Sequence, residues 1–173
     1  DYLNVRDTVV KELSDRFKAK PEELSERVSN LQQELKESQK QLEALKGELA
    51  VAKSDQLLGD AETVGEFQIL VAEMPGVDAE ALKTAAERLQ QKLGESAVVL
   101  GSGSDGKVSL VAAFSKSVNG KGLQAGKFIG GIAKMCGGGG GGRPNLAQAG
   151  GRDPSKLKEA LESAKEQLIE GLK

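Results

Sequence analysis

The sequence predicts an α+β protein, in which a long-helix hairpin or coiled-coil arm over residues 1–58 precedes a small globular α/β domain over residues 62–173. Three observations lead to this prediction. Apolar residues recur with heptad spacing through the first third of the chain. Patterns typical of strands and helices then follow in the order β-α-β-β-α-loop-α. The polar segment Gly59–Glu62 separates the two parts and marks the expected boundary.

The first expected helix of the arm spans residues 2–17 and places its apolar side chains on one face. These side chains are Leu3, Val9, Val10, Leu13 and Phe17. Pro21 separates this helix from the next one, because the residue before a proline disfavours helical backbone. Pro21 itself suits the first turn of the second helix.

The second expected helix carries an apolar seam over about four heptads. The seam consists of Leu24, Val28, Leu31, Leu35, Ser38, Leu42, Leu45, Leu49 and Ala52. We expect the two helices to pack as an antiparallel hairpin. Because the second helix is longer, part of its seam needs another partner, which is the globular domain, a second copy or a part of a larger protein.

The globular domain is expected to contain three strands and three helices. The first strand alternates apolar residues on both sides, which is typical of a strand covered on both faces. The expected strands are 66–73, 97–100 and 107–114, and the expected helices are 78–93, 123–135 and the segment from Asp153 onward. Asp78 and Asp153 are the expected N-caps.

Residues Gly101–Gly106 spell GxGxxG, the pattern of a dinucleotide-binding loop. That motif has to open a helix and to be followed by an acidic residue about 20 positions later. Here it precedes a strand, and the next acidic residue after Asp105 is Asp153. We therefore interpret the segment as a hairpin loop that ends in Asp-Gly.

The composition excludes several kinds of catalytic site. The chain has no histidine, so it has neither a histidine-based zinc site nor a Ser-His-Asp triad. The single cysteine, Cys136, excludes an internal disulfide, and we expect it to end a helix as a small apolar residue. No apolar run approaches the ~20 residues of a membrane span, so we expect no membrane partner. The chain begins at Asp1 rather than Met, and we expect a piece of a longer protein.

Basic residues are concentrated around the last third of the chain. The net charge is −2, yet residues 116–156 carry seven basic side chains and a single acidic one, Asp153. The seven are Lys116, Lys121, Lys127, Lys134, Arg143, Arg152 and Lys156. Local positive charge attracts phosphate backbones, which favours nucleic acid as the partner; an ordinary solvated surface is the alternative.

The most unusual segment lies inside this basic region and runs from Cys136 to Gly151. Six consecutive glycines, Gly137–Gly142, make a helix or a strand costly in backbone entropy, so we expect a glycine-rich loop over residues 137–151. A plain flexible linker is the alternative. A loop of this composition presents backbone N–H groups beside the guanidinium of Arg143, which is the chemistry of an anion-binding surface.

The glycine run and the following Arg143-Pro144-Asn145-Leu146-Ala147-Gln148-Ala149-Gly150-Gly151 resemble the signature of the C-terminal domain of alanyl-tRNA synthetases of the bacterial or organellar type. The helix start Leu123–Lys127 and the helical arm agree with this resemblance, which covers essentially the whole chain. The same domain is appended to DHH-type phosphoesterases.

The resemblance implies a non-catalytic domain that binds the elbow of tRNA, with tRNA-Ala as the expected partner, and that helps the aminoacylation and editing domains of the parent enzyme act on one tRNA. It implies a homodimer through the arm and a cytoplasmic, or organellar stroma or matrix, location. It implies no cofactor in this chain, whereas the parent enzyme uses ATP, Mg and a zinc ion.

The candidate nucleic-acid-binding residues come from two sources. By resemblance, the ligand-facing residues are Gly137, Gly138, Gly139, Gly140, Gly141, Gly142, Arg143 and Gln148. By charge and spacing, we add Lys127, Lys134 and Arg152. We expect Arg143 to pair with a phosphate or to stack on an exposed base, and the glycine N–H groups to cradle phosphate oxygens. No catalytic or metal-binding residue is expected.

Two other functions remain open at this point. The chain could be a structural module whose arm dimerises the parent enzyme, with the glycine segment serving as a tight connection. It could also be the substrate-clamping domain of a phosphoesterase, because that family shares the domain. The long arm favours the synthetase.

Overall fold

The computed structural model describes residues 2–173, with side chains described from Val5 onward. Asp1 and the side chain of Leu3, one of the expected apolar positions, therefore lie outside the described part. The chain divides into two compact units, residues 1–45 and 46–173. The second unit thus begins within a helix, earlier in the chain than the expected boundary at residues 59–62.

The first unit consists of helix α1 (Tyr2–Phe17), the 3-10 turn η1 (Pro21–Glu23) and the beginning of helix α2 (Leu24–Leu57). Lys18 ends α1 with a positive φ of 50°. Pro21 then starts the next turn, and the backbone N–H of Lys20 donates to the Glu23 carboxylate over 3.3 Å. Both helices therefore begin and end close to the residues that the proline and the apolar spacing predict.

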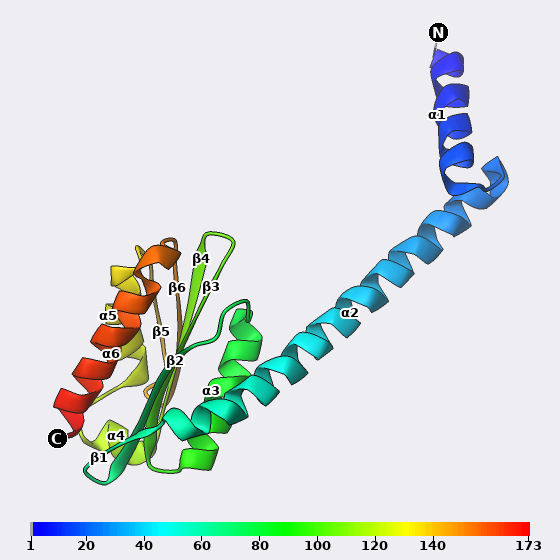
Figure 1. Ribbon diagram of the computed structural model, residues 1–173. Coiled ribbons are helices and arrows are strands. Elements are labelled where there is room, and N and C mark those ends of the chain that lie inside the picture. Colours follow the sequence, from blue (N-terminus) through cyan, green and yellow to red (C-terminus); the bar gives the residue numbers. More distant parts are fainter. Residues whose placement is uncertain (1) are drawn as a thin grey trace. The chain divides into compact units, whose positions relative to one another are not determined.

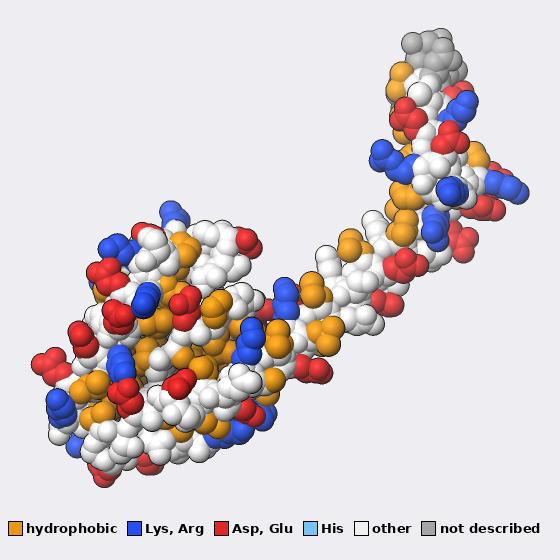
Figure 2. Space-filling model, in the orientation of Figure 1, with side chains coloured by type: hydrophobic (Ala, Val, Ile, Leu, Met, Phe, Trp, Pro, Cys, Tyr) orange, Lys and Arg blue, Asp and Glu red, His pale blue; other side chains and the backbone are white. Residues whose placement is uncertain are grey.

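The apolar side chains of this unit are largely exposed. Val5 on α1 is 61% exposed, and Leu35, Leu42 and Leu45 on α2 are between 52% and 62% exposed. The expected antiparallel hairpin is not formed: within the described residues α1 and α2 make no extended contact with each other, so neither helix covers the apolar side chains of the other. Figure 2 shows apolar side chains at the surface along the helical arm.

The second unit is built on a six-stranded sheet in the order β1-β2-β3-β4-β6-β5. Strands β2 and β3 are parallel, because helix α3 (Ala79–Leu93) connects them, and the other neighbouring pairs are antiparallel. The strands are β1 (Glu62–Val64), β2 (Phe67–Glu73), β3 (Ser96–Ser104), β4 (Lys107–Phe114), β5 (Gly139–Gly142) and β6 (Leu146–Gly151).

Helices cover both faces of this sheet (Figure 1). Helix α3 and the end of α2 pack on one face, while α5 (Ala125–Met135) and α6 (Leu157–Leu172) pack on the other. Strand β2 contributes Ile69 to the α5–α6 side and Leu70 to the α3 side, which confirms the prediction of a strand covered on both faces.

The end of α2 packs on the globular unit with a different face from the one that carries the heptad seam. Ala50 and Ser54 are fully buried there, whereas the seam residue Leu49 is 54% exposed. Asp55 joins this end of α2 to α3 through Arg88 at 3.2 Å and Lys92 at 2.7 Å. These two cations hold the pKa of the Asp55 carboxyl below its ordinary value, the hydrogen bond from Lys92 having the largest effect.

Two expected loops turn out to be shorter, because strands extend into them. The GxGxxG segment is not a six-residue loop: Gly101–Ser104 belongs to β3, and a two-residue turn, Asp105-Gly106, closes the hairpin with both φ angles positive. Gly101 lies beneath α6, where a Cβ would stand 2.8 Å from a Leu157 methyl carbon. The expected linker Gly59–Glu62 contains the end of a 3-10 turn and the first residue of β1.

The glycine-rich loop expected over residues 137–151 is instead mainly a β-hairpin. Gly139–Gly142 forms edge strand β5, which pairs with β6 in antiparallel register, and only Arg143–Asn145 turns the chain. Helix α5 packs directly on the backbone of β5. A Cβ at Gly126 would lie 2.5 Å from the Gly142 carbonyl oxygen, and one at Gly130 would lie 2.9 Å from that of Gly140. The ladder and this packing offset the entropy cost of ordering the glycines.

This packing predicts that Gly126→Ala destabilises the protein by about 1–3 kcal/mol, because the added methyl group would overlap backbone atoms that cannot rotate away. Gly131→Ala is the matched control on the same helix, since nothing lies within 4 Å of its Cβ position. Helix propensity predicts that the control gains up to about 1 kcal/mol. Urea unfolding of the two variants measures both effects, and equal stability of Gly126→Ala and the unaltered protein would contradict the packing.

Candidate nucleic-acid interface

Strand β6 presents different side chains to the two faces of the sheet. Ala147 and Ala149 face α5 and belong to the core on that side. Leu146 packs against the core on the α3 side, and Gln148 and Gly150 share its face by the alternation of a strand. Helix α3 lies mainly over β3 and β4, so the β5–β6 end of this face is less covered than its centre.

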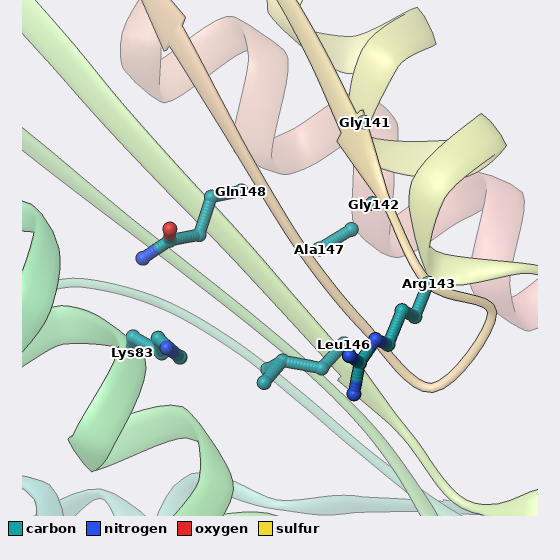
Figure 3. Close-up of a pocket in the computed structure, with 7 residues that line it drawn as sticks. All are labelled: Lys83, Gly141, Gly142, Arg143, Leu146, Ala147 and Gln148. Carbon is teal, nitrogen blue, oxygen red and sulfur yellow. The ribbon is translucent and has the colours of Figure 1, made fainter.

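Gln148 is held toward α3. Its side-chain amide nitrogen donates to the backbone carbonyl of Ala79, the first residue of α3, over 3.2 Å. Figure 3 shows the Gln148 side chain extending from β6 toward the helix. Ala79 is 69 positions away in the sequence, so this bond ties the hairpin to the start of α3.

Arg143 lies at the turn between β5 and β6. Its backbone N–H donates to the Leu146 carbonyl over 3.0 Å, which fixes the turn, and its side chain lies exposed beside Leu146 (Figure 3). Arg143 and Gln148 line one depression of about 320 Å³. Lys83 from α3 lines it from the opposite side, and no pattern in the sequence singles this lysine out.

A second depression, of about 580 Å³, lies at the other end of β6. Its basic side chains are Arg152, which follows β6, and Lys107, which begins β4. Apart from Val108, its other lining residues are small, namely Ser109, Gly137, Gly138, Gly139, Gly150 and Gly151. The backbone N–H of Arg152 donates to the Cys136 carbonyl over 2.8 Å, so the chain leaving β6 is fixed to the end of α5.

The glycines of β5 fall into two sets with different surroundings. Gly138, which precedes the strand, and Gly140 and Gly142 face β6, where an added Cβ would overlap backbone atoms of that strand. Gly139 has open space at its Cβ position, and Gly141 has only an ordinary contact at 3.8 Å. The first set is required by the fold, whereas the second set leaves a backbone surface without side chains beside the two depressions.

The structure does not bring all the predicted site residues together. Gly137–Gly142, Arg143, Gln148 and Arg152 gather along the β5–β6 hairpin. Lys127 and Lys134 are exposed on α5, which covers the opposite face of the sheet, and they line neither depression. Their shared helix face is real, but it is a separate basic surface.

The side chains of the two depressions supply positive charge and hydrogen-bond donors. No group of three or more potential metal ligands occurs among the residues that the structure describes. No helix within the described chain is long and apolar enough to cross a membrane. The arrangement can therefore bind an anionic ligand along β6, through lysine, arginine and amide donors and the exposed strand backbone.

Comparison with protein families then identifies the globular unit. The model of the DHHA1 domain matches residues 66–170. The chain belongs to the DHHA1 domain family. The match starts just before β2 and ends within α6, so it contains the β5–β6 hairpin and every candidate site residue named above.

The relatives of this chain indicate the kind of protein in which its DHHA1 domain occurs. The chain is 94% identical to the alanine–tRNA ligase of Trichodesmium erythraeum over all 173 residues, and 73% identical to that of Synechocystis over 171 residues. The chain spans only 20% of either ligase. Its structure matches the C-Ala domain of Aquifex aeolicus alanyl-tRNA synthetase with a TM-score of 0.58 and 35% identity, covering 63% of this chain and 97% of that domain. The chain therefore corresponds to the non-catalytic C-Ala region and not to the catalytic region.

The same fold occurs in RecJ of Thermus thermophilus, whose structure in complex with Mg²⁺ matches with a TM-score of 0.53. That match covers 87% of this chain and 21% of RecJ. At 16% identity it shows a common fold alone. It gives no support to a phosphoesterase setting for this DHHA1 domain.

Cys136 ends α5, as the sequence predicts, and it is fully buried. Burial raises the pKa of its thiol, and the negative charge of Asp153 raises it further. The thiolate is the reactive form, so we expect native Cys136 to react with a disulfide reagent at pH 8 at least about ten times more slowly than the unfolded chain. The same reaction in urea provides the reference rate, and equal rates would contradict the burial of this thiol.

Proposed function

We propose that this chain is the tRNA-binding C-Ala domain of an alanine–tRNA ligase, that it contacts the tRNA elbow, and that it helps the aminoacylation and editing domains act on one tRNA. The observation that carries the proposal is the surface along β6, where Arg143, Gln148 and Arg152 lie beside the bare glycine strand. The match to the C-Ala domain and the identity to alanine–tRNA ligases support the same assignment.

Recognition through shape and phosphate charge fits this surface better than the reading of bases. The residues that line the two depressions include no aromatic side chain, although stacking on aromatic rings is the usual means of holding an unpaired base. Lysine, arginine, glutamine and backbone donors instead suit the phosphates and riboses of a folded RNA. We propose that tRNA-Ala is bound in this way, without selection for its sequence by this domain.

The other partners belong to the proposed parent enzyme. In this proposal ATP, Mg and zinc serve its aminoacylation and editing domains, and this chain holds no cofactor. A cytoplasmic location remains a prediction. The charge pattern of the sequence groups Lys127 and Lys134 with the hairpin residues in one candidate site, and here we treat them as two surfaces. The β5–β6 hairpin is the proposed tRNA site. Lys127 and Lys134 on α5 form a separate basic surface whose part in binding has to be tested.

A pair of double variants tests the site. Arg143→Ala with Arg152→Ala and Lys127→Ala with Lys134→Ala each remove two positive charges, but from different surfaces. We expect the arginine pair to weaken tRNA binding and to lower the slope of log affinity against log salt by about 2, since each lost phosphate contact lowers it by about 1. The lysine pair should have the smaller effect.

The measurement is a salt titration of binding to tRNA-Ala, to another tRNA and to plain duplex RNA. Similar affinities for the two tRNAs and weaker binding of the duplex would agree with recognition of tRNA shape. An unchanged slope and affinity in the arginine pair would overturn the proposed site, and a larger effect of the lysine pair would move it to α5.

A second function is favoured by the exposed seam of α2. Val28, Leu35, Leu42 and Leu45 repeat with heptad spacing and are between 38% and 62% exposed. A seam of this kind is stabilised when it packs against another helix, and we propose that it joins two copies of the chain. This function is compatible with tRNA binding.

Sedimentation tests the proposed dimer. Leu35→Gln with Leu42→Gln should weaken self-association, because two seam positions lose apolar area, while Lys40→Gln on the opposite side of the helix should leave it unchanged. A monomer at all concentrations in the unaltered protein would remove the proposal.

A further inference from the structure

The β6 surface has basic side chains at both of its ends. At the turn end, Arg143 of the hairpin and Lys83 of α3 line one depression. At the other end, Lys107 of β4 and Arg152 line the second. Lys83 and Lys107 lie outside the basic region of residues 116–156, so the charge pattern of the sequence gives no reason to select them.

All four cations are available for a ligand. Among the ion pairs of the described residues, none involves Lys83, Lys107, Arg143 or Arg152. By contrast, Arg88 and Lys92, which lie further along α3, are paired with Asp55. Two acidic residues, Asp78 and Asp105, line a third depression, which Lys107 also lines.

Each of these two carboxylates accepts a hydrogen bond from within the protein. Asp78 caps α3 by accepting the Ala81 N–H over 2.9 Å. Asp105, in the turn between β3 and β4, accepts the hydroxyl of Ser104 over 3.3 Å. Neither carboxylate lines the two depressions that contain the four cations.

The register of the sheet shows what lies between the two ends. Ser109 of β4 pairs with Gly150 of β6, which pairs with Gly139 of β5, so one row across three strands carries nothing larger than a hydroxymethyl group. The next row toward Arg143 contains Gln148 opposite Gly141. A ligand that touches both ends therefore meets a low floor without carboxylates.

The distance between the ends sets the size of the ligand. Strand β6 has six residues, which at about 3.4 Å per residue corresponds to about 20 Å. A single phosphate or mononucleotide can occupy one end only. A nucleic-acid backbone is long enough to place phosphates at both ends of β6, and it carries further phosphate charges between them.

We propose that Lys83 and Lys107 are RNA-backbone contacts, and that together with Arg143 and Arg152 they hold phosphates at the two ends of β6. The ligand of this surface is then an extended RNA face that spans the strand. This inference rests on the proposed tRNA binding and adds two contacts from α3 and β4, which lie outside the glycine-rich segment of residues 137–151.

Binding of tRNA-Ala to the full chain at several salt concentrations tests the two lysines. We expect Lys83→Gln and Lys107→Gln each to lower the affinity about three- to tenfold and the salt slope by about 1, and the double variant to lower the slope by about 2. Lys158→Gln is the matched control, because Lys158 is exposed on α6, on the opposite face of the sheet, and should leave both quantities unchanged.

The outcomes separate this inference from the proposed function. If Lys83→Gln and Lys107→Gln bind like the unaltered protein while the Arg143→Ala, Arg152→Ala variant is weakened, tRNA binding stands and the two lysines are not contacts. If the unaltered protein does not bind tRNA, both proposals fail. Adenosine monophosphate at constant ionic strength should not displace tRNA, and displacement would show a site for one nucleotide in place of the extended one.

Discussion

Helix α5 approaches strand β5 so closely that a methyl group at Gly126 or Gly130 would overlap carbonyl oxygens of the strand. Strand β5, in turn, is pressed onto β6 at Gly140 and Gly142. This contact between a helix and bare backbone allows four consecutive glycines to form an edge strand. The rest of the candidate surface depends on it, because β5 and its turn fix where Arg143 and the chain after β6 can lie.

Basic side chains from two other elements lie beside this hairpin. Helix α3 contributes Lys83 and β4 contributes Lys107, and the bond from Gln148 to Ala79 ties the hairpin to the start of α3. Apolar residues bury the opposite side of the hairpin against α5, so only the α3 side offers both charge and accessible backbone.

Much of the fold follows from local patterns in the sequence. Helices α3 and α6 begin near the caps Asp78 and Asp153 and bury the faces that their apolar spacing predicts. The glycine strand could not be predicted in this way, because glycine has no side chain to show an alternating pattern. Its strand conformation depends on α5 and β6, which are tertiary contacts.

The residues of the proposed site could be predicted to a similar degree. Arg143, Gln148 and Arg152 could be found because they belong to the signature or adjoin it, and the structure places them along one strand. Lys83 and Lys107 could not, because only the sheet register and the position of α3 bring them to β6. The charge pattern also grouped the α5 lysines with the hairpin, since sequence proximity does not reveal that α5 crosses to the other face.

The proposed binding mode places RNA on the α3 side of the β5–β6 hairpin. Amide chemical shifts of the isotope-labelled chain, recorded during titration with tRNA-Ala, test it most directly. We expect the largest changes at Gly139, Gly141 and Gln148 and at the start of β4, with little change along α6. Changes confined to α5 and α6, with the hairpin unaffected, would contradict it.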